Sequence, residues 1–407
     1  MKGFARVVVV ILALVALGVG FVGGTAALDT FRPTNSKVTT VVNFEVKSGD
    51  SADSVGQRLQ ADGLIRSSLL FVRLARIKKL NSLVPGVYHL SPSMTMYAIL
   101  SKFLSGAPDV AQATDIFVNP ADGLRATQFP AYFTKLSKFS ATEFLSIAKT
   151  GIEPDGTKLW TKYWYIMPPV ASKTAYALDG YLDPTAQNFF LDATATDVIE
   201  KLVRQFGIDL CPGPASNPAQ YITSAKECRA HAITVGGKNI FDVMRAAYPD
   251  AKSDVVALND TIIIASFTVR EIRKSSDFAG VASVYHNRYL HSIGLLVGDV
   301  GLTFGSDPSV EYARDTLTPP ANGKWWVDLN GDGHKIAASS PYNTYNQSGM
   351  PPGPIANVYI AEIKAAASPA KSPNLYFVSD KCGKIYYATN SYDFNNSLLP
   401  KMNTGSC

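Results

Sequence analysis

The sequence predicts an α+β protein in three parts: an N-terminal transmembrane helix, a small β-α-α-β module, and a larger mixed α/β domain. Three observations support this prediction. The chain of 407 residues is longer than a single domain usually is. Its one long apolar stretch without charges lies at the N-terminus. Beyond that stretch, strand-like and helix-like hydrophobic periods follow one another. We expect the module at residues 37–107 and the larger domain at residues 108–407.

The N-terminal segment has the features of a membrane anchor. Residues 1–6 carry Lys2 and Arg6, and the uncharged residues 7–28 are long enough to cross roughly 30 Å of hydrocarbon as a helix. The positive charges place the N-terminus in the cytoplasm and the rest of a single-pass protein outside the cell membrane. A cleaved signal peptide, processed near Thr25-Ala26-Ala27, is the alternative. Both interpretations export the folded part.

Composition and charge argue against several classes of function. The net charge is +5, and no run of Lys and Arg interleaved with aromatic residues indicates nucleic-acid binding. An anionic polymer or surface is a better partner for such a chain. No glycine-rich loop suited to phosphate binding occurs, and we expect neither a cofactor nor a metal.

All four cysteines lie in the exported part, where disulfides persist. Proximity in sequence predicts the pairs Cys211–Cys228 and Cys382–Cys407, and the spacing fits no zinc pattern. The proline-containing segment 207–238 is interpreted as an inserted loop.

The small module follows from a regular order of signals. A β-branched strand lies within residues 37–46, and residues 47–51 form a turn that caps a helix. A second helix begins at Ser67 or Ser68, a strand covers 86–90, and another helix covers 95–104. In the larger domain, helices are expected from Thr194 or Thr196 to Phe206, and at 261–273, 281–290 and 361–367, with a strand at 374–378. The aromatic run 160–165 predicts core or lid packing, or stacking against sugars.

Glu271 ends the apolar helix at 261–273, where burial should raise its pKa toward the value that proton donation requires. A salt bridge with Arg270, Arg273 or Lys274 is the alternative. Pairing with Asp277, Asp299 or Asp307 across a cleft would permit glycoside hydrolysis.

Two loops carry further polar groups. Tyr342, Asn343, Thr344 and Tyr345 offer hydroxyls and an amide suited to sugar hydroxyls and N-acetyl groups, or form a structural turn. Residues 328–333 copy the first half of a calcium loop, but Ser339 stands where a bidentate glutamate is required. We therefore predict a hairpin turn there.

Six segments together resemble the endolytic murein transglycosylases, also called MltG-like or YceG-like proteins. They are residues 46–106, which resemble the family's LysM-like module, 178–184 (LDGYLDP), 265–271 (ASFTVRE), 281–288 (VASVYHNR), 306–312 (SDPSVEY) and 342–357 (YNTYNQSGMPPGPIAN). The resemblance implies a mixed α/β catalytic domain with a lysozyme-like helix that bears the catalytic glutamate.

The activity implied by this resemblance is lytic cleavage of the β-1,4 bond between N-acetylmuramic acid and N-acetylglucosamine, which leaves a 1,6-anhydro ring and limits strand length. One acid and base, Glu271, suffices for it. Asn287, Asp307, Tyr342, Asn343, Thr344 and Tyr345 are the implied substrate-binding residues. The implied partners are peptidoglycan strands, the cytoplasmic membrane and peptidoglycan synthases.

The sequence departs from the family pattern at several places, among them an unusually long segment at 291–304 and insertions at 211–228 and 328–333. Val269 replaces the first of two glutamates that often occur in the family helix, and Gly305 stands where the family commonly has Gln. A non-catalytic peptidoglycan-binding scaffold, or a peptidoglycan hydrolase, remains an alternative function.

Overall fold

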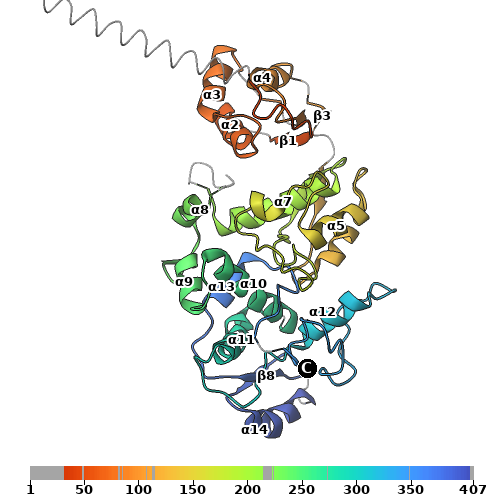
Figure 1. Cartoon of the computed structure of the whole chain (residues 1–407), viewed down its shortest axis with the longest axis vertical. Helices are drawn as coiled ribbons and strands as arrows, with labels where there is room; N and C mark the ends of the chain where they lie inside the picture. Colours follow the sequence, from red (N-terminus) through yellow and green to blue (C-terminus); the bar gives the residue numbers. More distant parts are fainter. Residues whose placement is uncertain are drawn as a thin grey trace, which may run out of the picture. The chain divides into compact units, whose positions relative to one another are not determined.

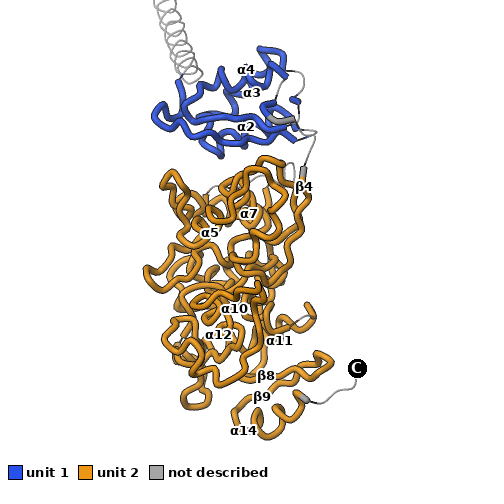
Figure 2. The backbone as a smooth tube through the Cα atoms, turned by 90° about the vertical axis from the view of Figure 1, so that its right-hand side faces the viewer, with its two compact units in different colours: residues 1–115, 215–221 blue, residues 116–214, 222–407 orange. Residues whose placement is uncertain are grey.

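The computed structural model describes residues 32–47, 50–80, 83–84, 86–106, 108–111, 115–213, 222, 224–272, 274–347 and 349–403. The chain divides into two compact units, residues 1–115 with 215–221 and residues 116–214 with 222–407 (Figure 2). The predicted membrane span at 7–28 lies outside the described residues. Within the described part, no helix has both the length and the apolar character needed to cross a bilayer.

Unit 1 has the predicted β-α-α-β order followed by a helix. Its elements are β1 (Val42–Val46), α2 (Ala52–Ala61), α3 (Ser68–Ile77), β2 (Gly86–Leu90), α4 (Met96–Leu104) and β3 (Val110–Ala111). The strands form an antiparallel sheet in the order β1-β2-β3. The Phe103 ring of α4 packs edge-on against the Phe71 and Tyr88 rings, with centroid distances of 6.1 and 4.7 Å. These aromatic contacts join α3 and α4 to the sheet.

The first part of unit 2 is a mixed α/β layer. It contains β4 (Asp115–Val118), the 3-10 helix η1 (Ala126–Tyr132), α5 (Ala141–Thr150), α6 (Leu159–Lys162), β5 (Gln187–Phe190) and α7 (Ala195–Leu210). Strands β4 and β5 pair in a two-stranded sheet. Tyr163 and Tyr165 of the aromatic run are buried, and Tyr165 donates its hydroxyl to the Val203 carbonyl at 2.9 Å. Core packing therefore accounts for these two rings.

The prediction of an inserted loop at 207–238 is wrong in part, because the segment contains helices and short strands. Helix α7 continues to Leu210, and α8 (Ala225–His231), β6 (Thr234–Val235) and β7 (Lys238–Asn239) follow. Ser224 caps α8 by accepting a hydrogen bond from the Glu227 backbone at 3.2 Å, a start signal visible in the sequence. The predicted Cys211–Cys228 disulfide is confirmed, with the Cα atoms 5.2 Å apart. Cys407 lies outside the described residues, so the Cys382–Cys407 pair stays a prediction.

A helical layer built around α10 (Asp254–Glu271) forms the second part of unit 2. Helix α10 packs against α9 (Ile240–Ala247), α11 (Phe278–Ser292), α12 (Asp307–Leu317) and α13 (Ile360–Ala367) (Figure 1). A short 3-10 turn, η2 (Ser275–Asp277), precedes α11. The chain ends with β8 (Tyr376–Ser379), β9 (Ile385–Ala388), α14 (Ser391–Asp393), the π-helical turn η3 (Phe394–Leu398) and the 3-10 turn η4 (Leu399–Asn403).

Helix α10 is the predicted buried helix, and it begins seven residues earlier than predicted. Ser253 caps its N-terminus by accepting a hydrogen bond from the Val256 backbone. The hydroxyls of Thr261, Ser266 and Thr268 donate to carbonyls three or four residues earlier in the helix, at 2.7 to 2.9 Å. These local bonds satisfy polar groups that would otherwise be costly in the core. The helix is therefore a rigid base for the residue at its end.

Helix α12 and the loop after it differ from the sequence-based expectation. We did not predict α12, although Pro308 at its first turn is a start signal. The described residues of the segment 318–350 form neither helix nor strand. The prediction of a hairpin turn at 328–333 is therefore wrong, because no paired strands flank the turn.

Candidate active site

Glu271 is the last residue of α10, and its side chain is partly accessible to solvent. The backbone of the next residue, Ile272, is extended, with φ −135° and ψ 154°. The carboxyl thus lies at the C-terminal end of a helix, where the helix dipole disfavours a negative charge. The position itself favours the protonated form.

Burial raises the pKa of Glu271 to about 7, and the Asp307 carboxylate nearby adds to the increase. The Tyr285 hydroxyl on α11 opposes it by donating a 2.6 Å hydrogen bond to Glu271 Oε1. The Arg288 guanidinium, one turn later on α11, also lowers this pKa. A carboxyl with these neighbours can both release and take up a proton near neutral pH.

Ser306 supplies another hydroxyl next to Glu271. The residue is fully buried, and its Oγ makes no hydrogen bond with another described residue. It nevertheless lies close enough to the carboxyl to lower the pKa of Glu271. A rotation of this hydroxyl would complete a second hydrogen bond to the charged form of the carboxyl.

No salt bridge neutralises Glu271 among the described residues, which do not include Arg273. Its neighbour Arg270 instead lies over the Trp326 ring, 4.2 Å from the centroid, and donates to the Gly123 carbonyl at 3.3 Å. A contact with an aromatic face is a common alternative to ion pairing for a guanidinium. The simple salt-bridge interpretation with Arg270 or Lys274 is therefore wrong.

Helix α12 brings two further carboxyls to this region. Asp307, at its N-terminus, is exposed and accepts a 2.6 Å hydrogen bond from the Tyr345 hydroxyl. Glu311, one turn later, is buried, and burial raises its pKa to about 7. Arg270 lowers the pKa of Glu311, whereas Glu271 raises it. The candidate active site therefore combines Glu271 with two carboxyls on one face of α12.

The Tyr285→Phe substitution gives a first prediction. It removes the hydrogen bond that stabilises the charged Glu271 carboxylate, so the pKa of Glu271 should rise further. An acid catalyst with a higher pKa stays protonated to higher pH, so the alkaline limb of the pH–activity profile should move upward. Cleavage of glycan strands, the activity that the sequence resemblance implies, measured between pH 5 and 9 would test this, and an unmoved or lowered limb would contradict it.

Comparison with known proteins places the chain in a family. The model of the YceG-like family matches residues 44–398. The chain belongs to the YceG-like family. It is 24% identical to an "Endolytic murein transglycosylase" of Streptococcus pneumoniae (strain D39) over 414 residues, which is 99% of this chain and 66% of that relative. A Bacillus subtilis protein with the same description is 25% identical over 388 residues, or 94% of this chain and 89% of that relative.

The chain thus spans about two thirds of the length of the pneumococcal relative. A crystal structure of a YceG-like protein from Listeria monocytogenes covers 88% of this chain and 98% of its own, at 23% identity and a TM-score of 0.47.

In this YceG-like chain, the segment 342–345 contributes one side chain to the site. Tyr345 contacts Asp307. Tyr342 is buried against the Tyr312 ring at 4.9 Å, and Asn343 donates to the Gly333 and Ile336 carbonyls. Thr344 accepts a 2.9 Å hydrogen bond from the Ser306 backbone. Tyr342, Asn343 and Thr344 therefore fix the loop that presents Tyr345. Thr344 also holds the backbone of Ser306 in place.

Asn287 also has a supporting position. Its Nδ2 donates to the carbonyls of Ser372 and Asn374, both at 2.8 Å. The adjacent Arg288 donates to the Leu375 and Phe304 carbonyls. These bonds attach α11 to the chain segments on either side of it. The substrate role of Asn287 stays a prediction.

Of the three carboxylates considered as partners for Glu271, the structure brings Asp307 into the site. Asp299 accepts hydrogen bonds from the Tyr376 hydroxyl and the Ser391 backbone at the C-terminal hairpin. Asp277 precedes α11 as its N-cap residue. Sequence reasoning missed Glu311, although its spacing of four residues from Asp307, on a helix with Pro308 in its first turn, would have placed both on one face.

Proposed function

We propose that this chain is an endolytic lytic transglycosylase that cleaves the β-1,4 bond between N-acetylmuramic acid and N-acetylglucosamine in peptidoglycan strands. The observation that carries the proposal is Glu271, a carboxyl without a salt bridge among the described residues, with a pKa raised to about 7 and a 2.6 Å hydrogen bond from Tyr285. The printed description of the pneumococcal and Bacillus relatives, endolytic murein transglycosylase, supports the same activity.

The reaction needs one proton shuttle. Glu271 donates its proton to the glycosidic oxygen as the bond from this oxygen to C1 of the muramic acid breaks. The resulting carboxylate then accepts the proton of the C6 hydroxyl while O6 bonds to C1, which closes the 1,6-anhydro ring. No water is consumed, and Glu271 returns to its protonated form. Tyr285 and Arg288 stabilise the carboxylate between the two steps.

A hydrolase is the second candidate function, because Glu311 provides a further buried carboxyl near Glu271. In hydrolysis, a second carboxylate activates water or acts as the nucleophile. The two functions differ in their products. Purified exported protein incubated with isolated glycan strands should release 1,6-anhydro ends, detected by mass spectrometry, whereas reducing ends would favour hydrolysis. Intact strands that remain bound to the protein would favour a non-catalytic scaffold.

The Glu311→Gln variant distinguishes a transglycosylase from a hydrolase by a change in the protein instead of by the products. A transglycosylase that uses Glu271 alone should retain its activity within about tenfold, because Gln keeps the shape of the Glu311 side chain. A hydrolase that needs Glu311 would lose about 100-fold or more. Initial rates on glycan strands measure the difference.

The remaining parts of the chain fit this function. We propose that residues 7–28 anchor the protein in the cytoplasmic membrane and that residues 37–107 form a LysM-like module that binds glycan. Asp307 and Tyr345 would contact substrate hydroxyls, because they lie beside Glu271 with accessible polar atoms. We also propose a peptidoglycan synthase as a partner, on the family resemblance alone.

A further inference from the structure

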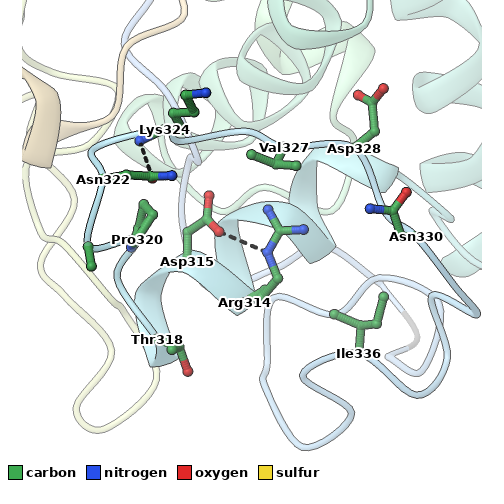
Figure 3. A pocket seen from close by; sticks show the side chains of 11 residues that line it. Arg314, Asp315, Thr318, Pro320, Asn322, Lys324, Val327, Asp328, Asn330 and Ile336 are labelled. Carbon is green, nitrogen blue, oxygen red and sulfur yellow. Dashed lines mark hydrogen bonds and ion pairs between the residues drawn. The ribbon is translucent and has the colours of Figure 1, made fainter.

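A pocket of about 590 Å³ lies in unit 2 between α12 and the loop that follows it (Figure 3). Its size is within the range of small-molecule sites, about 300–1,000 Å³. Figure 3 shows Arg314 and Asp315 of α12 between two stretches of the loop, with Val327 on one side and Ile336 on the other. None of these residues belongs to the site around Glu271, and the mechanism does not use them.

The pocket is linked to the helix that bears Glu271 through the contact between Arg270 and Trp326. Arg270, the neighbour of Glu271 in sequence, lies 4.2 Å from the Trp326 ring. The Trp326 backbone donates a 3.0 Å hydrogen bond to Asp315, and the next residue, Val327, lines the pocket. These contacts connect the end of α10, which carries Glu271, to the residues that line the pocket.

Electrostatic interactions also connect the pocket with Glu271, through Glu311. Arg314 and Asp328, which both line the pocket, interact with Glu311, and Glu311 interacts with Glu271. The Arg314 Nε donates to Asp315 at 2.9 Å, while the buried Nη2 of Arg314 has no hydrogen-bond partner in the described structure. An unpaired buried donor is costly, and a small movement of the guanidinium toward the pocket would let a ligand oxygen satisfy it.

The lining favours an uncharged ligand with both apolar and polar faces. Its charged residues are two cations, Arg314 and Lys324, and two carboxylates, Asp315 and Asp328, so their charges cancel. The other lining residues combine apolar surface with amide and hydroxyl groups; they are Thr318, Pro320, Ala321, Asn322, Val327, Asn330 and Ile336. An N-acetylhexosamine has this chemistry, because its ring and acetyl methyl are apolar and its hydroxyls and amide form hydrogen bonds. A charged peptide stem would gain no net attraction.

We propose that this pocket is a distal subsite that binds an N-acetylhexosamine unit of the glycan strand, outside the pair of sugars whose bond is cleaved. The proposal rests on the proposed function for the identity of the strand. Occupation of the subsite would require a long substrate and would keep the enzyme away from strand ends. This is the behaviour expected of a glycosidase that cuts within chains.

The test uses binding, so that it does not depend on cleavage. The full exported protein carrying Glu271→Gln is titrated with a β-1,4-linked N-acetylglucosamine hexamer and with the dimer, by calorimetry. Two further changes, Ile336→Arg and Ala321→Arg, each place a long side chain in the pocket. Val300→Arg, at a fully exposed position outside the pocket, is the matched control.

The hexamer should bind about tenfold more weakly to both pocket variants than to the control, and the dimer should bind all of them equally. Equal hexamer affinity in all variants, or no hexamer binding by the parent protein, would overturn the proposal. Ala321 is an exposed turn residue, so its variant tests the pocket even where Ile336→Arg disturbs folding. Failure of the proposed function would appear in a separate measurement. The protein that retains Glu271 would then bind strands but produce no anhydro ends.

Discussion

Replacement of Glu271 by Gln should reduce glycan cleavage by about 1,000-fold or more while the protein stays folded. Gln has nearly the shape of Glu and can still accept the hydrogen bond from Tyr285, but its amide cannot donate an acid proton at neutral pH. Because the proposed mechanism uses this one carboxyl in both steps, no other described side chain replaces it. Release of anhydro products, measured under single-turnover conditions, gives the rate.

Glu362→Gln is the matched control for this substitution. Burial also raises the pKa of Glu362 to about 7, and the Glu362 side chain is buried. It lies on α13, however, and Asp122 is the charged side chain that acts on it, not Glu271. Both variants neutralise a partly charged buried group, so their thermal stabilities should change alike. Comparable loss of activity in both would show that folding, not proton transfer, explains the result for Glu271.

The wild-type pH profile provides an independent check on the same residue. The acid form of Glu271 starts the reaction, so activity should fall as the pH rises through the pKa of about 7. The profile should be insensitive to neutralisation of Glu362. An alkaline limit well above this range would assign the proton donor to another group.

The position of Glu271 could be predicted from the sequence, but its surroundings could not. An apolar run that ends on a carboxyl indicates a desolvated acid at a helix end, and the structure has this arrangement. The partners Tyr285 and Ser306 come from separate elements, 14 and 35 residues away in sequence. Only tertiary packing determines which of many nearby hydroxyls faces the carboxyl.

The loop at 342–345 shows why residue type alone does not separate a binding role from a structural one. Asn343 and Thr344 have groups suited to sugars, but both are fully buried and bond to the backbone of neighbouring segments. Loops without helix or strand must satisfy their backbone groups by such side-chain bonds. A polar residue in a turn-rich motif is therefore as well suited to holding the loop as to holding a ligand.

The motif at 178–184 has an architectural role that the sequence did not reveal. Asn357 accepts hydrogen bonds from the Gly180 and Leu182 backbones at 2.8 and 2.9 Å, and donates to the Leu124 carbonyl at 3.0 Å. Asp179 accepts from the Tyr312 hydroxyl of α12 at 2.7 Å. Segments separated by up to 233 residues in sequence, those of Leu124 and Asn357, thus meet at the 178–184 motif. This network fixes the two helices that carry Glu271 and Glu311.

The Gly180→Ala substitution should therefore destabilise the protein strongly, by about 3–5 kcal/mol. Gly180 has φ +88°, a conformation that costs an L-residue about 1–2 kcal/mol. A Cβ there would also lie 2.6 Å from Ile262 Cγ2 of α10 and 2.6 Å from Pro354 Cγ. The proline ring cannot rotate away, and the Ile262 side chain is fully buried, so the backbone must shift.

Gly156→Ala separates the two contributions to this cost. Gly156 has nearly the same φ, +89°, but a Cβ there would have no atom within 4 Å. Its replacement should cost about 1–2 kcal/mol, the backbone contribution alone. The difference between the urea midpoints of the two variants then measures the packing cost at Gly180. Equal midpoints would contradict the close approach of residue 180 to α10, and with it the argument that the 178–184 motif fixes the helix that ends at Glu271.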